Sequence, residues 1–234
     1  MIDKNRLCSL AKENGIILDD MALDRFDTYA ELLVEWNGKM NLTAITEPEE
    51  IEVKHFLDCL MLPKYFNLDY IQTVIDVGAG AGFPSVPLLI YKPNLCLTMM
   101  DAINKRLTFL DTAVHVLGLE AQLIHERAEV AGQDENYREK FDLATARAVA
   151  PMNVLAEYCL PFVKVGGYFV ALKGCNDDTQ EAKNAIATLG GEIVDNISYK
   201  LNSTEPRSIV VIKKISQTPT QYPRKSKKIS TKPL

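Results

Sequence analysis

The sequence has 234 residues, of which 47% are hydrophobic and 24% charged. This composition is that of a folded globular protein and excludes wholesale disorder or a collagen-like repeat. The sequence contains no apolar run of the roughly 18 residues that a membrane helix needs, and its first residues lack the apolar core of a signal peptide. Five widely spaced cysteines without a CxxC pair favour free thiols in a reducing cytoplasm over disulfides or a zinc site. We therefore expect a cytoplasmic protein with no membrane segment and no metal.

The net charge of −5 conceals an uneven distribution of charge. Residues 206–234 hold eight Lys and Arg side chains and no Asp or Glu. Basic segments often bind nucleic acid, because Lys and Arg release counterions from phosphates. The same composition also suits a solvated tail that only aids solubility. Charge alone leaves both interpretations open.

The first 66 residues are predicted to be helical. One apolar helix face is indicated at three- and four-residue steps by Phe26, Tyr29, Ala30, Leu33 and Trp36. A second helix is expected to begin near Pro48, with Thr46 as its cap, and to continue through Leu60.

From about residue 72, short β-rich runs alternate with helical stretches. Strands are predicted at 73–78, 97–101, 122–128, 141–148 and 168–174, and helices at 84–91, 102–117, 151–160 and 177–189. Two final β-rich runs, 192–199 and 207–215, have no helix between them. They must pair antiparallel, since a parallel connection needs about a dozen residues. The pattern predicts an α/β fold with a Rossmann-like doubly wound sheet, mostly parallel, with an antiparallel C-terminal hairpin and additional N-terminal helices.

Three parts of the chain are expected to form one compact unit. They are an N-terminal helical extension (1–66), the α/β domain (67–215) and a basic C-terminal tail (216–234). No apolar pattern in the tail predicts a contribution to a core.

A glycine-rich loop follows the first predicted strand, in the sequence DVGAGAGFP (76–84). Alternating glycines such as Gly78 and Gly80 allow a sharp turn and close approach of the backbone to a ligand. In a doubly wound sheet, ligands bind outside the carboxyl ends of the strands, where this loop is expected. A tight strand-to-helix turn without a ligand is the plainer interpretation.

The spacing of the glycines narrows the kind of ligand. A dinucleotide fingerprint would need a third small residue where Phe83 or Ser85 stands, and the Walker phosphate-binding pattern is absent. Asp101 ends the second predicted strand, where a carboxylate suits the two hydroxyl groups of a ribose, although it could equally cap the next helix. These features favour a nucleoside cofactor without a diphosphate, and S-adenosylmethionine fits that description.

The sequence resembles the bacterial small-subunit ribosomal RNA guanine-N7 methyltransferase family, also called glucose-inhibited division protein B. The resemblance spans nearly the whole chain in order. It is carried by WNGKMNLTAIT (36–46), EVKHFLDCL (52–60), DVGAGAGFPSVPL (76–88), DAINKRLTFL (101–110), ERAE (126–129), FDLATARAVAP (141–151), EYCLPFVKVGGYFVALKG (157–174), PRSIVVIKK (206–214) and YPRKSKK (222–228). One departure is Ser85, where the family usually has glycine.

The resemblance implies a class I methyltransferase that uses S-adenosylmethionine. It implies cofactor contacts from Gly78, Phe83, Ala128, Glu129 and Arg147, in addition to Gly80 and Asp101 from the pattern itself. It further implies that Lys173 and Arg207 handle the RNA. The implied partner is 16S rRNA or the small ribosomal subunit, with a guanine of the 530-loop region as the acceptor.

The lack of an evident acid–base pair agrees with this chemistry. Guanine N7 carries a free lone pair, so we expect no catalytic general base, only positioning and a favourable electrostatic setting. An N/D-P-P-Y/F segment, typical of exocyclic amine methylation, is replaced by RAVAP (147–151). Cys159 and Cys175 lack the context of a cysteine nucleophile. Two alternatives stay open: a methyltransferase acting on a small molecule or protein, and a non-enzymatic RNA-binding module.

Overall fold

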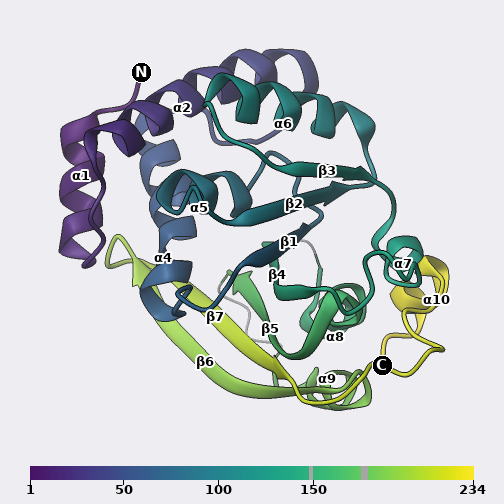
Figure 1. Ribbon diagram of the computed structural model, residues 1–234. Coiled ribbons are helices and arrows are strands. Elements are labelled where there is room, and N and C mark those ends of the chain that lie inside the picture. The colour runs from purple at the N-terminus through teal and green to yellow at the C-terminus, as the bar shows by residue number, and fades with distance from the viewer. Residues whose placement is uncertain (148–149, 175–178) are drawn as a thin grey trace.

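A computed structural model describes residues 1–147, 150–174 and 179–234. These residues form a seven-stranded sheet in the order β3-β2-β1-β4-β5-β7-β6 (Figure 1). Strands β1 to β5 pair in parallel, and β7 pairs antiparallel with both β5 and β6. The strands are β1 (Thr73–Val77), β2 (Cys96–Asp101), β3 (Gln122–His125), β4 (Phe141–Arg147), β5 (Val163–Lys173), β6 (Gly191–Leu201) and β7 (Glu205–Lys214). The predicted doubly wound sheet with its antiparallel C-terminal hairpin is confirmed.

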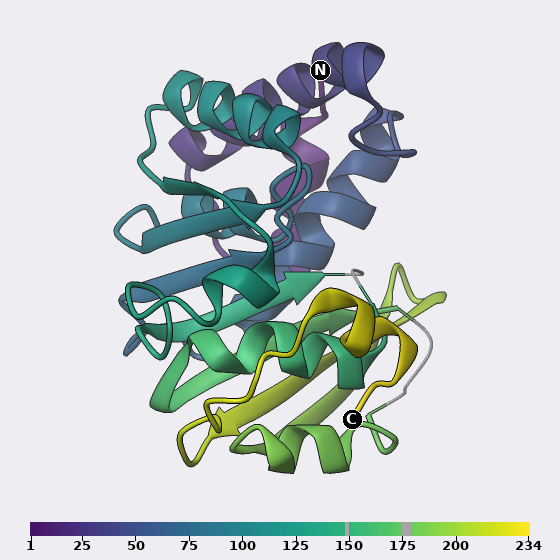
Figure 2. The ribbon, with the colours of Figure 1, turned by 90° about the vertical axis from the view of Figure 1, so that its right-hand side faces the viewer.

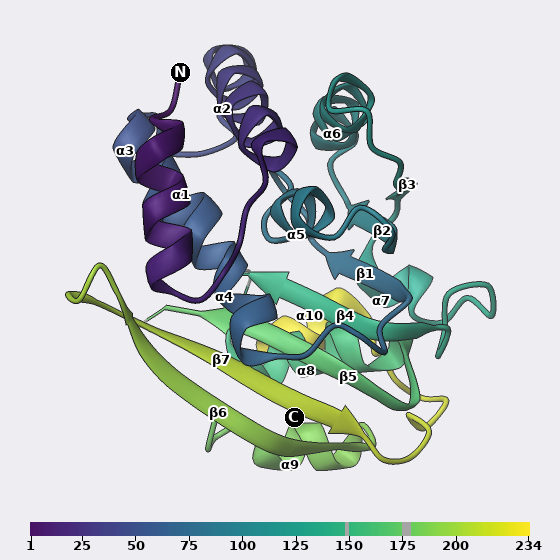
Figure 3. The same ribbon diagram turned by 60° about the vertical axis from the view of Figure 1, so that its left-hand side comes forward.

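Helices cover both faces of the sheet and enclose a separate hydrophobic core on each (Figure 3). The first face carries α1 (Lys4–Glu13), α2 (Asp20–Met40), α4 (Asp58–Tyr65), α5 (Ser85–Tyr91) and α6 (Asn104–Val116). The second carries α7 (Ala128–Ala131), α8 (Met152–Cys159), α9 (Lys183–Thr188) and α10 (Ser226–Thr231). Three short elements complete the described chain: α3 (Pro48–Glu50), the π-helix η1 (Ile51–Leu57) and the 3₁₀ turn η2 (Leu160–Phe162).

The apolar face predicted for the first long helix is buried in α2. Phe26, Tyr29, Ala30 and Leu33 are fully buried, and Trp36 packs against Phe109. The Tyr29 hydroxyl also donates a hydrogen bond to the carbonyl of Ala81, in the glycine loop. The N-terminal helices therefore pack on the loop that the sequence marks as a ligand site.

The second N-terminal helix differs from its prediction. Its first turn begins at Pro48 with Glu47 at the cap position and no side-chain cap, so the predicted cap by Thr46 is wrong. The backbone then continues as the π-helix η1 until α4 begins. A π-turn makes i→i+5 hydrogen bonds and is often found at functional sites. The 3.6-residue periodicity of the sequence predicted a regular α-helix here.

Element boundaries in the α/β part also shift, and β5 begins at Val163, five residues before its predicted start. β3 ends at His125, and residues 128–131 form the short helix α7 in place of the end of the predicted strand. The helix predicted over 177–189 is observed as α9, Lys183–Thr188. Residues 177 and 178 lie outside the described residues, as does Cys175.

The basic C-terminal tail packs against the second face, alongside α7 and α8 (Figure 2). Ile229 is fully buried and Tyr222 nearly so, which corrects the expectation that residues 216–234 contribute nothing to a core. The Arg138 guanidinium donates to the carbonyls of Thr218 and Tyr222 at 2.6 and 2.8 Å. Isolated apolar residues in a polar segment form no periodic pattern, so no sequence signal predicted this packing.

Candidate functional site

The glycine loop turns sharply at the carboxyl end of β1. Gly78, Gly80 and Gly82 all have positive φ angles, of 76°, 59° and 87°, which L side chains adopt only with strain. The amides of Gly78 and Ala79 both donate to the carbonyl of Met100 at 2.9 Å, so the loop lies against the end of β2. The local sequence therefore dictates the turn, and β2 fixes its position.

A cavity of about 250 Å³ opens beside this loop, at the carboxyl ends of β1, β2 and β3. It contains four of the sequence-predicted cofactor residues: Gly78, Asp101, Ala128 and Glu129. Its remaining lining is Val77, Met100, Ala102, Ile103, Arg106, Glu126, Arg127, Leu155, Tyr158 and Ser226. The mixture of apolar walls with a few convergent polar groups is typical of a small-molecule site.

Asp101 connects the loop to the cavity. Its Oδ2 accepts from the Gly80 amide at 2.9 Å, and its Oδ1 accepts from the Ile103 amide at 2.8 Å. The Arg106 guanidinium lies 3.3 Å from Oδ2. Asp101 is 3% exposed, so these donors stabilise a buried carboxylate. It does not cap α6, whose N-cap is Ile103 with no side-chain cap, and its lining position leaves the ribose role as a prediction.

A second buried carboxyl lies under the loop, at Asp76 of β1. Neither of its oxygens, nor Oγ of the neighbouring Ser85, makes a hydrogen bond of good geometry with another described residue. Burial raises the pKa of the Asp76 carboxyl to about 7, although the nearby donors of Ser85 and the charge of Arg147 oppose this shift. Buried polar atoms are usually paired, so this carboxyl is available to a polar or cationic partner, although it is not among the residues that line the cavity.

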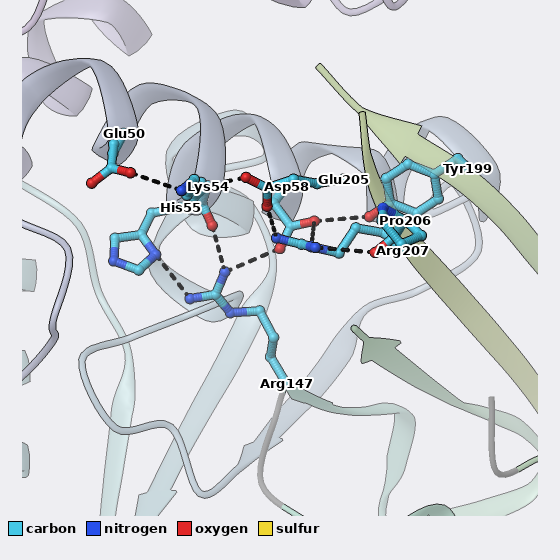
Figure 4. Close-up of polar contacts among 9 residues, drawn as sticks. All are labelled: Glu50, Lys54, His55, Asp58, Arg147, Tyr199, Glu205, Pro206 and Arg207. Carbon is cyan, nitrogen blue, oxygen red and sulfur yellow. Dashed lines mark hydrogen bonds and ion pairs between the residues drawn. The ribbon is translucent and has the colours of Figure 1, made fainter. Parts of the chain in front are cut away.

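Phe83 and Arg147 lie together, away from the described lining of that cavity. The Arg147 guanidinium lies over the Phe83 ring, 4.8 Å from its centroid. Its Nη1 donates to the carbonyl of Lys54 at 3.0 Å and contacts Asp58 Oδ2 at 3.2 Å, and its Nη2 donates to Nδ1 of His55 at 3.1 Å (Figure 4). The carboxyl end of β4 is thereby joined to η1 and α4.

Of the two residues predicted to handle RNA, Arg207 joins this polar cluster through Asp58. Arg207 lies 3.6 Å from Asp58 Oδ1 and 2.8 Å from Glu205 Oε2, within the contacts of Figure 4. The Tyr199 hydroxyl donates to Asp58 Oδ1 at 2.9 Å. Lys173, at the end of β5, donates to the carbonyl of Ala150 at 3.2 Å. Both predicted residues lie outside the lining of that cavity, Lys173 on β5 and Arg207 on β7.

Sequence reasoning missed His55, Asp58, Tyr158 and Ser226. His55 is buried, and its ring stacks on Phe83 with the two centroids 4.2 Å apart. Its other contact shows a further role, since it also holds Arg147. The HFLDCL motif (55–60) was the available signal for His55 and Asp58, whereas no pattern linked Tyr158 to Ser226.

Comparison with known proteins identifies the family. The family model described as rRNA small subunit methyltransferase G matches residues 22–209. The chain belongs to this family. It is 51% identical to the ribosomal RNA small subunit methyltransferase G of Alkaliphilus metalliredigens over 95% of each chain. It is 48% identical to the protein of the same name from Brevibacillus brevis over 99% of each chain.

Solved structures share the fold of this family member. A SAM-dependent O-methyltransferase from Thermotoga maritima aligns with a TM-score of 0.51 at 13% identity, covering 80% of this chain and 72% of that one. The Rossmann-like class of the sheet is thus confirmed. Along the described residues, every helix is too short or too polar to cross a membrane. Among the same residues, no group of three or more His, Cys, Asp or Glu side chains could hold a metal ion.

Proposed function

We propose that this protein transfers a methyl group from S-adenosylmethionine to N7 of a guanine in the 530-loop region of 16S rRNA. The observation that carries the proposal is the match to the rRNA small subunit methyltransferase G family over residues 22–209. The cavity beside the glycine loop supports the proposal, because it offers a place where the cofactor could bind. A ribosomal RNA substrate also favours a cytoplasmic location.

The residues present fit such a cofactor. S-adenosylmethionine supplies an electrophilic methyl group on a sulfonium, together with a nucleoside and an amino-acid end. The unpaired, buried carboxyl of Asp76 suits a cationic group, and the Asp101 carboxylate lines the cavity where a nucleoside could bind. We assign cofactor binding to Gly78, Asp101, Ala128 and Glu129 from the cavity lining, to Gly80 from the loop pattern, and to Phe83 and Arg147 from the family resemblance. From the same resemblance we assign RNA contacts to Lys173 and Arg207.

The proposed reaction needs no proton transfer by the protein. The N7 lone pair forms the new N–C bond while the S–C bond breaks, leaving S-adenosylhomocysteine and a cationic 7-methylguanine ring. The protein's contribution is then to hold donor and acceptor in line and to offer a suitable electrostatic setting. Consistent with this, the pKa of His55 is lowered to about 3 by burial and by the charge of Arg147, which makes it a poor base at neutral pH.

Methyl transfer to authentic subunits tests the proposal. Labelled S-adenosylmethionine is incubated with small ribosomal subunits that lack their own 7-methylguanine, and the RNA is digested and analysed by mass. We expect labelled 7-methylguanosine at a single site. Cofactor binding without transfer to naked rRNA, assembly intermediates or mature subunits would contradict the RNA substrate and favour a small-molecule or protein acceptor. Failure to bind the cofactor would favour a non-enzymatic RNA-binding module.

A further inference from the structure

The C-terminal segment 222–231 forms part of the wall of the cofactor cavity. Ser226, the first residue of α10, lines the same cavity as Gly78 and Asp101. Tyr158 of α8 lines it as well, with its hydroxyl 3.4 Å from Oγ of Ser226. Two segments that are far apart in the sequence thus bring two hydroxyl groups to one side of the cavity. Figure 2 shows α10 lying against α8.

Both hydroxyl groups have unused hydrogen-bonding capacity. Hydrogen bonds between hydroxyl oxygens usually span 2.5–3.0 Å, so the contact of 3.4 Å is long. Within the part of the chain that the structure describes, neither hydroxyl has another hydrogen-bond partner. Each hydroxyl can donate once and accept twice, so Tyr158 and Ser226 are able to bind a polar ligand edge in the cavity.

A buried ion pair holds these two residues in place. Glu157, immediately before Tyr158, is fully buried and receives the Arg224 guanidinium in a bidentate contact, with Nη2 2.6 Å from Oε2 and Nε 2.8 Å from Oε1. The Arg224 backbone amide also donates to Oε1 at 2.8 Å. Bidentate, charge-assisted contacts of this kind fix orientation as well as distance. Glu157 is next to Tyr158 in the chain, and Arg224 lies two residues before Ser226. The ion pair between Glu157 and Arg224 therefore positions both hydroxyl groups.

Further contacts hold the segment against the body. The Gln133 side-chain amide donates to the carbonyl of Pro223 at 3.0 Å, and Pro223 packs on Gly132 so closely that an added Cβ there would lie 2.9 Å from its ring. Ile229 is fully buried, and Tyr222 belongs to the second core. The segment is therefore docked at both ends, with Ser226 facing the cavity between them.

We propose that Tyr158 and Ser226 bind the adenosine end of S-adenosylmethionine and that Arg224 and Glu157 are a positioning pair for them. The assignment rests on the proposed function, which supplies the cofactor. It also implies that the C-terminal segment contributes to the cofactor site in addition to carrying basic side chains.

Binding of S-adenosylhomocysteine, measured by calorimetry on the full chain without RNA, tests the two hydroxyl groups. We expect Ser226→Ala and Tyr158→Phe each to raise the Kd about 2- to 10-fold, the range expected for one net hydrogen bond. Ser230→Ala is the matched control, because Ser230 is exposed on the same helix and does not line the cavity. Wild-type affinity in both hydroxyl variants, or an equal loss in the Ser230 variant, would overturn the inference.

The positioning pair is tested by Arg224→Met combined with Glu157→Gln, which avoids leaving one buried charge unpaired. We expect the Kd for S-adenosylhomocysteine to rise about 10-fold. We also expect KM for the cofactor to rise while kcat at saturating cofactor stays within twofold. A folded variant with unchanged Kd would overturn the role of the pair, and if the variant does not fold, the hydroxyl variants decide. A wild-type protein that does not bind S-adenosylhomocysteine would instead overturn the proposed function.

Discussion

Nη2 of Arg147 donates to Nδ1 of His55 across 3.1 Å, where the carboxyl end of β4 meets η1. Because Nδ1 accepts this hydrogen bond, the imidazole proton is on Nε2, which donates to Oγ1 of Thr43 at 2.9 Å. Phe83 contacts both partners, since the His55 ring stacks on it and the Arg147 guanidinium lies over it. The N-terminal helical region thus fixes side chains of both the glycine loop and β4.

This arrangement makes stability depend on the neutral form of His55. Burial and the charge of Arg147 lower its pKa to about 3, whereas the unfolded chain binds the proton near pH 6.5. Between these values the unfolded state holds more protons, so the free energy of unfolding falls as pH falls below 6.5. For His55 alone, we expect the free energy of unfolding to be about 2 kcal/mol lower at pH 5 than at pH 7.

Urea unfolding of His55→Gln at pH 7 and pH 5 measures this contribution. Glutamine does not titrate, so the variant should lose less free energy of unfolding than the wild type over this interval. His115→Gln is the control, because His115 is exposed. The same loss in His55→Gln as in the wild type would show that His55 is not held neutral.

The glycine loop offers a matched pair of substitutions. An added Cβ at Gly82 would lie 2.6 Å from Val86 Cγ2 and 2.8 Å from both Leu110 Cδ2 and the Tyr29 hydroxyl. At Gly80 it would meet only a backbone oxygen at 3.9 Å. Both positions have positive φ, so Gly80→Ala should cost about 1–2 kcal/mol of stability. Gly82→Ala should cost about 1–3 kcal/mol more because of overpacking. Thermal and urea unfolding compare the two, and equal losses would contradict the packing of Tyr29 on the loop.

Asp76 should change the free energy of unfolding with pH in the opposite direction to His55. Burial raises its pKa to about 7, so between pH 4 and pH 7 the native state holds a proton that the unfolded state has lost. The free energy of unfolding contributed by this group therefore falls as pH rises over that range. Asp76→Asn removes the effect, and it should stabilise the protein by about 1–3 kcal/mol more at pH 8 than at pH 5.

Urea unfolding at the two pH values checks the Asp76 prediction. Asp111→Asn serves as the control, since Asp111 is exposed. If Asp76→Asn gave the same change at both pH values, the carboxyl would have an ordinary pKa in the folded state. Calorimetry with S-adenosylhomocysteine on the same variant reports separately whether Asp76 also contributes to cofactor binding.

The doubly wound sheet and the glycine loop could be predicted from the sequence because their signals are local. A β-rich run, a glycine loop and an acidic residue at the next strand end lie within 26 residues, from Asp76 to Asp101, and the α/β rules place them at one edge. The same rules bring Gly78 and Asp101 together in one cavity, whereas Ala128 and Glu129, which also line it, were predicted only from the family resemblance.

The polar cluster around Arg147 could not be predicted from local sequence signals. Its partners His55 and Asp58 lie about 90 residues earlier in the chain, and no periodicity encodes a buried polar pair between distant elements. The docking of the C-terminal tail was missed for a related reason. Its anchors are single residues, such as Arg224 on Glu157, within a segment whose composition is that of a solvated tail.

Three exposed lysines of the C-terminal segment, Lys225, Lys227 and Lys228, are close in sequence to Ser226, one of the residues that line the cavity. Among the described residues, none of the three lysines makes an ion pair. Free lysines next to a proposed methyl-transfer site suit the phosphates of an RNA substrate. Their removal should therefore affect RNA and cofactor binding differently.

We expect the triple alanine variant of these lysines to bind 16S rRNA more weakly while its Kd for S-adenosylhomocysteine stays unchanged. The slope of log affinity for RNA against log salt should shrink by up to about 0.7–0.9 per lost phosphate contact. Alanine variants of the exposed Lys12 and Lys183 control for charge alone. Deleting residues 216–234 should weaken the binding of both RNA and S-adenosylhomocysteine, because that deletion also removes Ser226 and the buried Ile229. An unchanged salt slope in the triple variant would place the RNA elsewhere, on the side of Lys173 and Arg207.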